Sequence, residues 1–403
     1  MPDIDISYKG SSIAQMSASG TKTLNTKNLI CTDDITIQYT RPSGSASAPY
    51  NDVNFYDYDG TILYSYSAAE FANLSAMPAN PAHDGLTAQG WNWTLADAKA
   101  QVLLSGALDI GQQYKSADGK TRLYVRVFYN ALLLRLYLNQ SVGRNTTIDW
   151  GDGSATETVS GTGNKSANHS YSSIGDYVIT LTVTSGTTKL GGASTSTSTI
   201  VANTDGAVNA NKCIMYRVEI GNSMTINRYA FYTQYGLDTI VAPPMTSSDY
   251  FGTPYSCRPL RCLIVSSGVT NLYCRSSSAV KYLCLPKSVT QFASDCFRDM
   301  TNLFRIAIPS GVTTIPSGAF RSCIALSKLV IPSGVTSIGA NAFDSCSSMR
   351  EYHFKSTTPP TLADATVFNS IPSQCKIYVP NAKLATYQSA NVWSGFASYM
   401  VGE

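Results

Sequence analysis

The C-terminal half of this 403-residue chain repeats itself at an interval of 23 residues. Three consecutive stretches, 282–303, 305–326 and 328–349, align residue for residue. A fixed period of this length is typical of a solenoid, because one such unit cannot bury its own apolar side and becomes stable only when it stacks on copies of itself. The stack presents a long continuous surface, so the repeat favours recognition over catalysis.

Within each repeat, apolar side chains recur at the same positions. An apolar-polar-apolar alternation predicts a short strand with one buried face, ended by Pro286, Pro309 or Pro332. Looser copies extend the pattern back to Val218, so we expect about seven coils. The buried strand positions are Leu283 and Leu285, Ile306 and Ile308, Leu329 and Ile331, and Tyr352 and Phe354, and an aromatic ladder of Phe297, Phe320 and Phe343 follows them.

The pattern IPSGVTSIGxxAFxxCxxL at 308–326 and 331–349 resembles bacterial leucine-rich repeats of the BspA surface-antigen type. The segment 358–403 resembles the closing segment of that family. This resemblance implies a terminal strand at 377–380 and a cap in which Trp393 covers the end of the stack.

A second recognisable unit lies upstream, at 121–190. The turn WGDGS at 150–154, the segment 169–171 and GDYVITLTV resemble a PKD-type immunoglobulin-like sandwich. Alternation along 178–184 agrees with a half-buried strand, and earlier strands are expected over about 122–139. Asp149 and Asp152 could be a catalytic pair or calcium ligands, but acids beside glycines in a turn usually cap their own backbone.

The N-terminal third divides into two further modules. Residues 1–42 predict a small β module, and the run 43–51 reads as a flexible linker. Residues 52–120 predict an α+β module with a hairpin at DYDGTI and helices capped by Ser67 and Thr94. Trp91 and Trp93 could stack on sugar rings, although large aromatic side chains more often belong to a core. Both modules resemble segments that recur in structural proteins of phages and prophages.

The predicted architecture is therefore a multidomain, mainly β chain. Its order is the N-terminal β module, the α+β module, the PKD-type Ig-like sandwich, a Ser/Thr/Gly linker at 191–205, the leucine-rich-repeat solenoid at 206–357 and the C-terminal cap at 358–403.

Composition excludes several classes of partner and cofactor. A net charge of +3 gives no nucleic-acid footprint, and no apolar run reaches the length of a membrane span. The ten cysteines show no CxxC pair with companion histidines, and Cys323 and Cys346 share a repeat slot with Met300. We therefore expect buried free thiols, with no metal and no other cofactor.

No enzymatic activity is predicted. His83, His169 and His353 fall in three different modules, and none has a nucleophile or acid at motif spacing. A glycan hydrolase with two scattered carboxylates stays an open alternative, but nothing in the sequence brings such a pair together.

The sequence begins without the basic and apolar regions of a secretory signal peptide. A virion component, made in the host cytoplasm and released by lysis, accounts for a surface-type repeat protein without an export signal. We expect a tail fibre or baseplate appendage that binds other virion proteins through its N-terminal module. The alternatives are a capsid decoration or head fibre, and a bacterial surface adhesin.

The solenoid is expected to bind a host-surface glycan or protein through the residues that alternate with its buried strand positions. Virion fibres are commonly trimers, but no heptad pattern is present, so any symmetry would come from the N-terminal module or the particle. The candidate ligand-binding residues on this face are Tyr282, Arg305, Lys328, Val330, Glu351 and His353.

Overall fold

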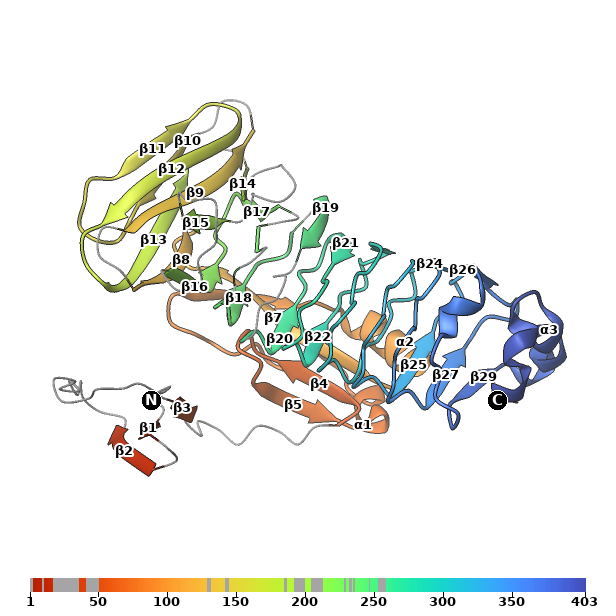
Figure 1. Ribbon diagram of the computed structural model, residues 1–403. Coiled ribbons are helices and arrows are strands. Elements are labelled where there is room, and N and C mark those ends of the chain that lie inside the picture. Colours follow the sequence, from red (N-terminus) through yellow and green to blue (C-terminus); the bar gives the residue numbers. More distant parts are fainter. Residues whose placement is uncertain are drawn as a thin grey trace. The chain divides into compact units, whose positions relative to one another are not determined.

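The computed structural model divides the chain into two compact units, Met1–Ala48 and Pro49–Glu403 (Figure 1). The first unit holds a three-stranded antiparallel sheet of order β2-β1-β3, made of β1 (Asp3–Tyr8), β2 (Ser11–Met16) and β3 (Thr36–Thr40). The structure describes residues 3–8, 11–16, 36–40, 51–128, 132–141, 145–184, 187–191, 200–203, 213–227, 230–231, 234, 236–245, 247–252 and 259–403.

The second unit begins with the α+β module. Its sheet has the order β5-β4-β7-β6 and carries two helices. Gly60, with φ of +84°, makes the turn of the predicted hairpin. The elements are β4 (Val53–Tyr56), β5 (Ile62–Tyr66), α1 (Ala68–Ala72), β6 (Leu86–Trp91), α2 (Leu95–Ser105) and β7 (Leu108–Ser116).

The predicted helix caps of this module are confirmed. Ser67 and Glu70 form a reciprocal capping box at α1, and the Thr94 side chain accepts from the Asp97 backbone N–H at the start of α2. Trp93 is 5% exposed, and Trp91 packs against Phe55 with ring centroids 4.8 Å apart. The tryptophan pair thus belongs to the core of the module and is not an exposed sugar-stacking platform.

Two sheets follow, and their inward side chains share one core. One sheet has the order β11-β10-β13-β8, and in the other β9 pairs with β12 on one side and with β14 and β15 on the other. Their strands are β8 (Thr121–Val127), β9 (Leu132–Gln140), β10 (Asn145–Asp149), β11 (Glu157–Ser160), β12 (Gly163–Tyr171), β13 (Gly175–Val183), β14 (Thr188–Leu190) and β15 (Val201–Asn203).

The acids of the WGDGS turn cap their own backbone, as predicted. Asp149 Oδ1 accepts from the Gly151 N–H at 2.9 Å, and Asp152 Oδ1 accepts from the Ser154 N–H at 3.1 Å. Burial disfavours the Asp152 carboxylate, but hydrogen bonds from Ser154 and His169 outweigh it and hold its pKa at about 2. Asp152 is therefore ionised at neutral pH, and its carboxylate accepts hydrogen bonds that hold the turn in place.

The solenoid stacks parallel strands in two rows. We call the outer side of the first row, which holds β16, β18, β20, β22, β25, β27 and β29 (Lys376–Val379), the strand face. Figure 1 shows its coils in succession from green to blue. The strands are β16 (Cys213–Glu219), β17 (Met224–Ile226), β18 (Thr239–Val241), β19 (Ser247–Gly252), β20 (Cys262–Ile264), β21 (Val269–Tyr273), β22 (Tyr282–Cys284), β23 (Gln291–Phe292), β24 (Thr314–Ile315), β25 (Lys328–Ile331), β26 (Ser337–Ile338), β27 (Glu351–Phe354) and β28 (Thr361–Leu362).

The predicted aromatic ladder is confirmed. The rings of Phe297 and Phe320 stack with centroids 5.0 Å apart, and those of Phe320 and Phe343 stack at 5.8 Å. Phe368 continues the ladder beyond the predicted set, 5.4 Å from Phe343. All four rings are at most 1% exposed, so the coils share one continuous core.

The C-terminal segment closes the stack. Trp393 is 1% exposed and packs against Phe354 and Tyr387, so it covers the end of the core as predicted. The predicted terminal strand, here β29 (Lys376–Val379), is not the last, because β30 (Met400–Gly402) pairs parallel with it. The other elements are η2 (Ala365–Phe368), η3 (Asn381–Lys383), α3 (Leu384–Ser389) and η4 (Trp393–Tyr399).

The sandwich and the solenoid are not separate domains joined by a linker. β16 pairs antiparallel with β8 of the sandwich and parallel with β18 of the solenoid, so one strand belongs to both. Their buried residues form a single core cluster. β15, which lies inside the predicted linker 191–205, pairs with β9.

Seven cysteines in the described part of the chain are buried free thiols, as predicted; Cys31 and Cys257, and the side chain of Cys213, lie outside it. The thiols of Cys323 and Cys346 donate to the carbonyls of Phe297 and Phe320, one coil earlier, at 3.1 and 3.2 Å. Burial raises the pKa of Cys346 to about 12. A thiol held this far from ionisation packs as a small apolar side chain.

Candidate ligand-binding surface

On the strand face, outward residues of neighbouring strands line up in rows. Lys328 lies opposite Glu351, and Glu351 opposite Lys376. In the adjacent row, Val330 lies opposite His353, and His353 opposite Tyr378. Each row therefore crosses strands β25, β27 and β29 at right angles to the chain direction.

The N-terminal part of this face is covered by the α+β module of the same chain. Ile264 and Cys284 are 8% and 0% exposed, and they share a small apolar cluster with Tyr56. Tyr282 packs on Tyr56 with ring centroids 4.9 Å apart. The sequence pattern shows which side chains leave the solenoid core but not what packs on them, so it did not predict that the module covers this part of the face.

The close approach of the two parts requires a glycine. A Cβ placed on Gly111, in β7, would lie 2.4 Å from Ile264 Cγ2, well inside van der Waals contact. Figure 1 shows β7 running beside β20 and β22. The absence of a side chain at Gly111 lets the module sheet lie directly on the solenoid strands.

Side-chain donors from the loop before α2 bind carbonyls of two successive coils. Asn92 Nδ2 donates to the carbonyls of Val265 at 3.3 Å and Cys284 at 3.0 Å. Trp93 Nε1 donates to the Leu285 carbonyl at 2.7 Å. These bonds hold the loop before α2 on the solenoid.

A further donor acts where the solenoid ladder is interrupted. Residues 303–309 form no strand, although they are equivalent to β22 and β25. Gln101 Nε2, from α2, donates to the Ile308 carbonyl at 3.0 Å. The helix therefore supplies a hydrogen bond to a strand position whose ladder is missing.

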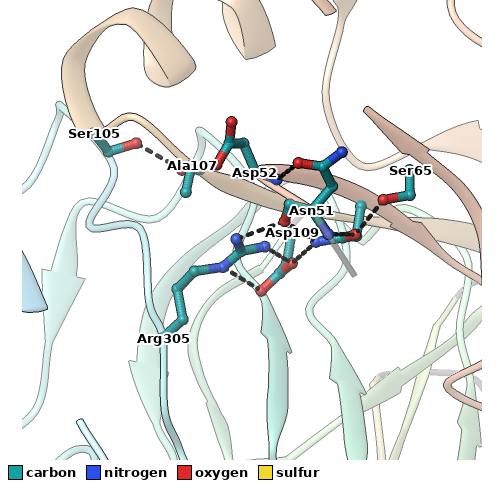
Figure 2. Close-up of polar contacts among 8 residues, drawn as sticks. Asn51, Asp52, Ser65, Ser105, Ala107, Asp109 and Arg305 are labelled. Atoms are coloured by element: carbon teal, nitrogen blue, oxygen red, sulfur yellow. Dashed lines mark hydrogen bonds and ion pairs between the residues drawn. The ribbon is translucent and has the colours of Figure 1, made fainter. Parts of the chain in front are cut away.

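Arg305, one of the six candidate residues, is held by the α+β module (Figure 2). Its Nε donates to Asp109 Oδ2 at 3.3 Å, its Nη2 to Asp109 Oδ1, and its Nη1 to the Asn51 carbonyl at 3.0 Å. Asp109 Oδ1 also accepts from Asn54 Nδ2, and Asn54 Oδ1 accepts from Ser65 Oγ at 2.9 Å. The side chains of Arg305 and Asp109 are only 17% and 4% exposed, so this pair lies inside the interface.

The open part of the strand face begins at β25. The Lys328 and Glu351 side chains are 55% and 39% exposed, with their charged atoms 3.3 Å apart. His353 Nδ1 is 2.7 Å from Glu403 Oε2, and its Nε2 is 3.0 Å from Glu351 Oε2. The His353 ring stacks on Tyr378 with centroids 4.5 Å apart and planes at 9°.

Hydrogen bonding sets the charge state of both carboxylates. The hydrogen bond from His353, with a weaker contribution from Lys328, lowers the pKa of Glu351 below its ordinary value. Burial raises the pKa of Glu403, but hydrogen bonds from Lys355 and His353 outweigh it and give a net lowering. This surface therefore presents ionised carboxylates and cationic side chains at neutral pH.

A pocket of about 190 Å³ lies where the module meets the open face, and we call it the seam pocket. One wall comes from the end of α2 and the other from two solenoid coils. Two of the candidate residues besides Arg305 line it. Its lining residues are Ser105, Ala107, Phe304, Arg305, Ile306, Ser327, Lys328 and Val330.

The six candidate residues thus fall into two groups. Tyr282 and Arg305 contact the α+β module, whereas Lys328, Val330, Glu351 and His353 lie on β25 and β27. Of these four, Lys328 and Val330 line the seam pocket. Sequence reasoning missed Asp109 and Asn51. Asp109 is an acid inside the otherwise uncharged strand segment LDIGQQY, and this was the signal available for a buried ionic partner.

The three histidines stay in different parts of the fold, each beside a carboxylate. His83 Nε2 lies 2.7 Å from Asp57, and His169 Nε2 lies 2.7 Å from Asp152. Across the described ranges, no three His, Cys, Asp or Glu side chains gather in a way that could hold a metal ion. No helix in the described part of the chain is long and apolar enough to cross a membrane.

Residues 271–388 match the model of the BspA type leucine-rich repeat region, in six copies. The match confirms the predicted repeat family for this part of the chain. It also extends past residue 357, into the segment that the sequence pattern assigned to the cap. No curated protein matched the sequence.

Proposed function

We propose that this chain is a non-enzymatic component of a phage virion, in a tail fibre or baseplate appendage, that recognises a host-surface ligand through its leucine-rich repeats. The N-terminal unit attaches it to other virion proteins, and the open strand face meets the host.

The observation that carries the proposal is the contrast between the two sides of each open strand. The inward side repeats the same apolar ladder from coil to coil. The outward side changes at every coil, from Lys328 and Val330 to Glu351 and His353 and then to Lys376 and Tyr378. A surface whose chemistry varies on an invariant scaffold suits recognition of a specific partner.

The absence of enzymatic activity is part of the proposal and has its own support. In the open face, both ring nitrogens of His353 face carboxylates, and both of these are also paired with lysines. A general base needs a free nitrogen or oxygen directed at a substrate proton. The placement in a virion is supported by the resemblance of residues 1–120 to modules of phage structural proteins.

Binding of the labelled full-length chain to a panel of intact bacterial strains tests the proposal. We expect binding to some strains and not others, and loss of most of it in the variant Lys328→Ala/Glu351→Ala/Tyr378→Ala. The variant Lys165→Ala/Asn164→Ala, on β12 of the sandwich, should bind like the wild type. Equal binding to all strains, or unchanged binding by the triple variant, would refute ligand recognition by this face.

A structural role as a capsid decoration or head fibre is the second candidate. It is favoured by the single core that runs from the sandwich through the solenoid, since a continuous unit can stiffen a particle. Locating the chain on intact particles separates the candidates, because an adsorption role predicts density at the tail tip and a decoration role predicts it on capsomers. Detection of the chain on bacterial surfaces without particles would instead support a bacterial adhesin.

A further inference from the structure

The seam pocket is lined by apolar residues and by polar ones, and we call the polar ones its rim. Ile306 and Val330, both less than 10% exposed, lie beside the half-buried Phe304. Ser105, Ser327 and Lys328 add polar groups to the lining. A pyranose ring has the same division, with C–H bonds on its faces and hydroxyls around its edge, so the pocket is complementary to a sugar.

The rim offers both hydrogen-bond acceptors and a cation. Ser105 Oγ lies 2.8 Å from the Gln101 carbonyl oxygen and 2.7 Å from the Ala107 carbonyl oxygen, so its hydrogen is used at the end of α2. Figure 2 shows the contact with Ala107. The oxygen is left to accept from a ligand hydroxyl. An acidic peptide side chain would use the cation alone and leave these hydroxyls without a role, so the lining favours a sugar over a peptide.

The volume limits what the pocket can enclose. Sites that enclose a whole small molecule usually measure about 300–1,000 Å³. At about 190 Å³, the seam pocket is large enough for one ring and too small for an oligosaccharide. It is therefore one subsite of a longer ligand.

The direction of the longer ligand follows from the rows of the strand face. From the pocket, Lys328, Glu351 and Lys376 continue across β25, β27 and β29. Neighbouring strands lie about 4.8 Å apart, close to the length of one pyranose unit in an extended polysaccharide. A chain that crosses the strands would place about one sugar on each.

The charges select the kind of sugar. Arg305 is balanced by Asp109, but Lys328 and Lys376 flank the single carboxylate of Glu351, which His353 also shares. Lys328 lines the pocket with a 55% exposed side chain, and its ammonium lies 3.3 Å from Glu351. Because Lys376 lies opposite the same carboxylate, the two lysines exceed it by one positive charge, which matches a singly charged anion. A uronic acid carries one such carboxylate on its ring.

We propose that the seam pocket is the anchoring subsite for a uronic acid unit of an acidic polysaccharide that continues along the open strand face. This inference rests on the proposed function, because it names the ligand class of the same surface. Ring stacking in the pocket supplies the position, and Lys328 discriminates the acid from the neutral sugar.

Binding of the full-length chain to oligomers of galacturonic acid and of galactose tests the subsite, because these sugars differ only in the carboxylate. We expect the wild type to bind the acidic oligomer about tenfold more tightly, which is about 1.4 kcal/mol. Ser327→Trp should fill the pocket and remove binding to both oligomers. Lys328→Gln should retain weak binding and lose the preference for the acid.

Two matched controls accompany these variants. Ser333→Trp places the same side chain at an exposed position in the same coil, outside the pocket lining, and Lys165→Gln removes a lysine from the sandwich. Both should bind like the wild type, and circular dichroism should show all four variants folded. A Ser327→Trp variant that binds as well as Ser333→Trp would overturn the proposal.

Cell binding measured in parallel separates the two proposals. Wild-type protein that discriminates between strains but binds no galacturonate oligomer would overturn the uronic acid subsite and leave host recognition intact. Equal affinity for poly-L-glutamate and the galacturonate oligomer would show that the face binds acidic peptides as well as the acidic sugar. This result would also overturn the uronic acid subsite. Failure to bind any cells would count against the proposed function itself.

Discussion

The repeat pattern places Arg305 on the surface of the solenoid, yet its side chain forms a largely buried ion pair. It occupies an outward position of the repeat, as Lys328 does one coil later. The difference is Asp109, which lies opposite Arg305 in the α+β module and is almost fully buried. A carboxylate in such a place needs a charged partner, because burying it alone is costly. Arg305 is therefore primarily the ion-pair partner of Asp109, although it also lines the seam pocket.

Removing one member of this pair should be far more costly than removing both. Arg305→Ala leaves Asp109 buried and unpaired, and we expect a loss of about 3–5 kcal/mol in the free energy of unfolding. Arg305→Met/Asp109→Leu should recover most of it, since two apolar side chains of similar volume fill the space. Urea unfolding of the three proteins measures the difference. A double variant no more stable than Arg305→Ala would contradict this view of the pair.

The cluster around His353 predicts a loss of stability in acid. The pKa values of Glu351 and Glu403 lie below their ordinary value of 4.5 in the folded protein. A lowered folded pKa means that both groups stabilise the fold fully above about pH 4.5, and that this contribution disappears as the pH falls through the folded pKa values. Glu403→Gln should lose stability at pH 7 and should show a weaker decline in melting temperature between pH 5 and pH 3.

The wild type provides the reference for this measurement. If the melting temperatures of the wild type and Glu403→Gln differ by the same amount at pH 7 and pH 3, the carboxylate does not act through its charge.

At the scale of elements, the main feature is the contact between the α+β module and the solenoid. The module donates side-chain N–H groups to carbonyls at equivalent ends of successive strands, through Asn92, Trp93 and Gln101. One of these carbonyls, that of Ile308, belongs to the coil that forms no strand on the strand face. Each such bond contributes about 0.5–1.5 kcal/mol, so the module compensates for the interruption of the ladder.

Gly111 is the position where this contact is most easily disturbed. Gly111→Ala should cost about 1–3 kcal/mol, because the new methyl group overlaps Ile264 at the centre of the contact. Adding Ile264→Ala should restore part of the loss by making room. Gly395→Ala, where a Cβ would meet nothing within 4 Å, is the matched control and should be nearly neutral. Thermal unfolding of the four proteins measures these effects, and equal destabilisation by Gly111→Ala and Gly395→Ala would contradict the close approach.

At the scale of the whole molecule, residues 49–403 form one compact unit. The strand β16 joins the sandwich to the solenoid, and side-chain hydrogen bonds join the α+β module to the interrupted coil. We therefore expect residues 49–403 to unfold in a single calorimetric transition, with the same midpoint in the presence or absence of residues 1–48. The solenoid fragment 206–403 should unfold at a lower temperature, since it loses β8 and the module. Two separate transitions in 49–403 would contradict this prediction.

The repeated and local features of the fold could be predicted from the sequence. The contacts between segments that lie far apart in the sequence could not. The ladder of Phe297, Phe320 and Phe343 follows from the 23-residue spacing of these phenylalanines in the sequence. The capping residues Ser67 and Thr94 follow from local chemistry. The burial of Cys284 and Ile264 could not be predicted, because it depends on the α+β module returning to coils about 170 residues later in the chain. For the same reason, Arg305 looked like its neighbour Lys328, although only one of them faces a buried acid.

The interrupted coil at 303–309 divides the array into a part whose number of repeats is fixed and a part whose number can vary. Insertion of one 23-residue copy upstream of it would move Val265, Leu285 or Ile308 out of reach of the side chains that bind their carbonyls. Downstream of β25, the hydrogen bonds between backbone groups in the described part of the chain join each coil to its neighbours and to the cap, so copies can be gained or lost by recombination between nearly identical segments. The evolutionary freedom of this protein therefore lies in the length of its C-terminal array, and a lineage could lengthen its outer surface without disturbing the seam.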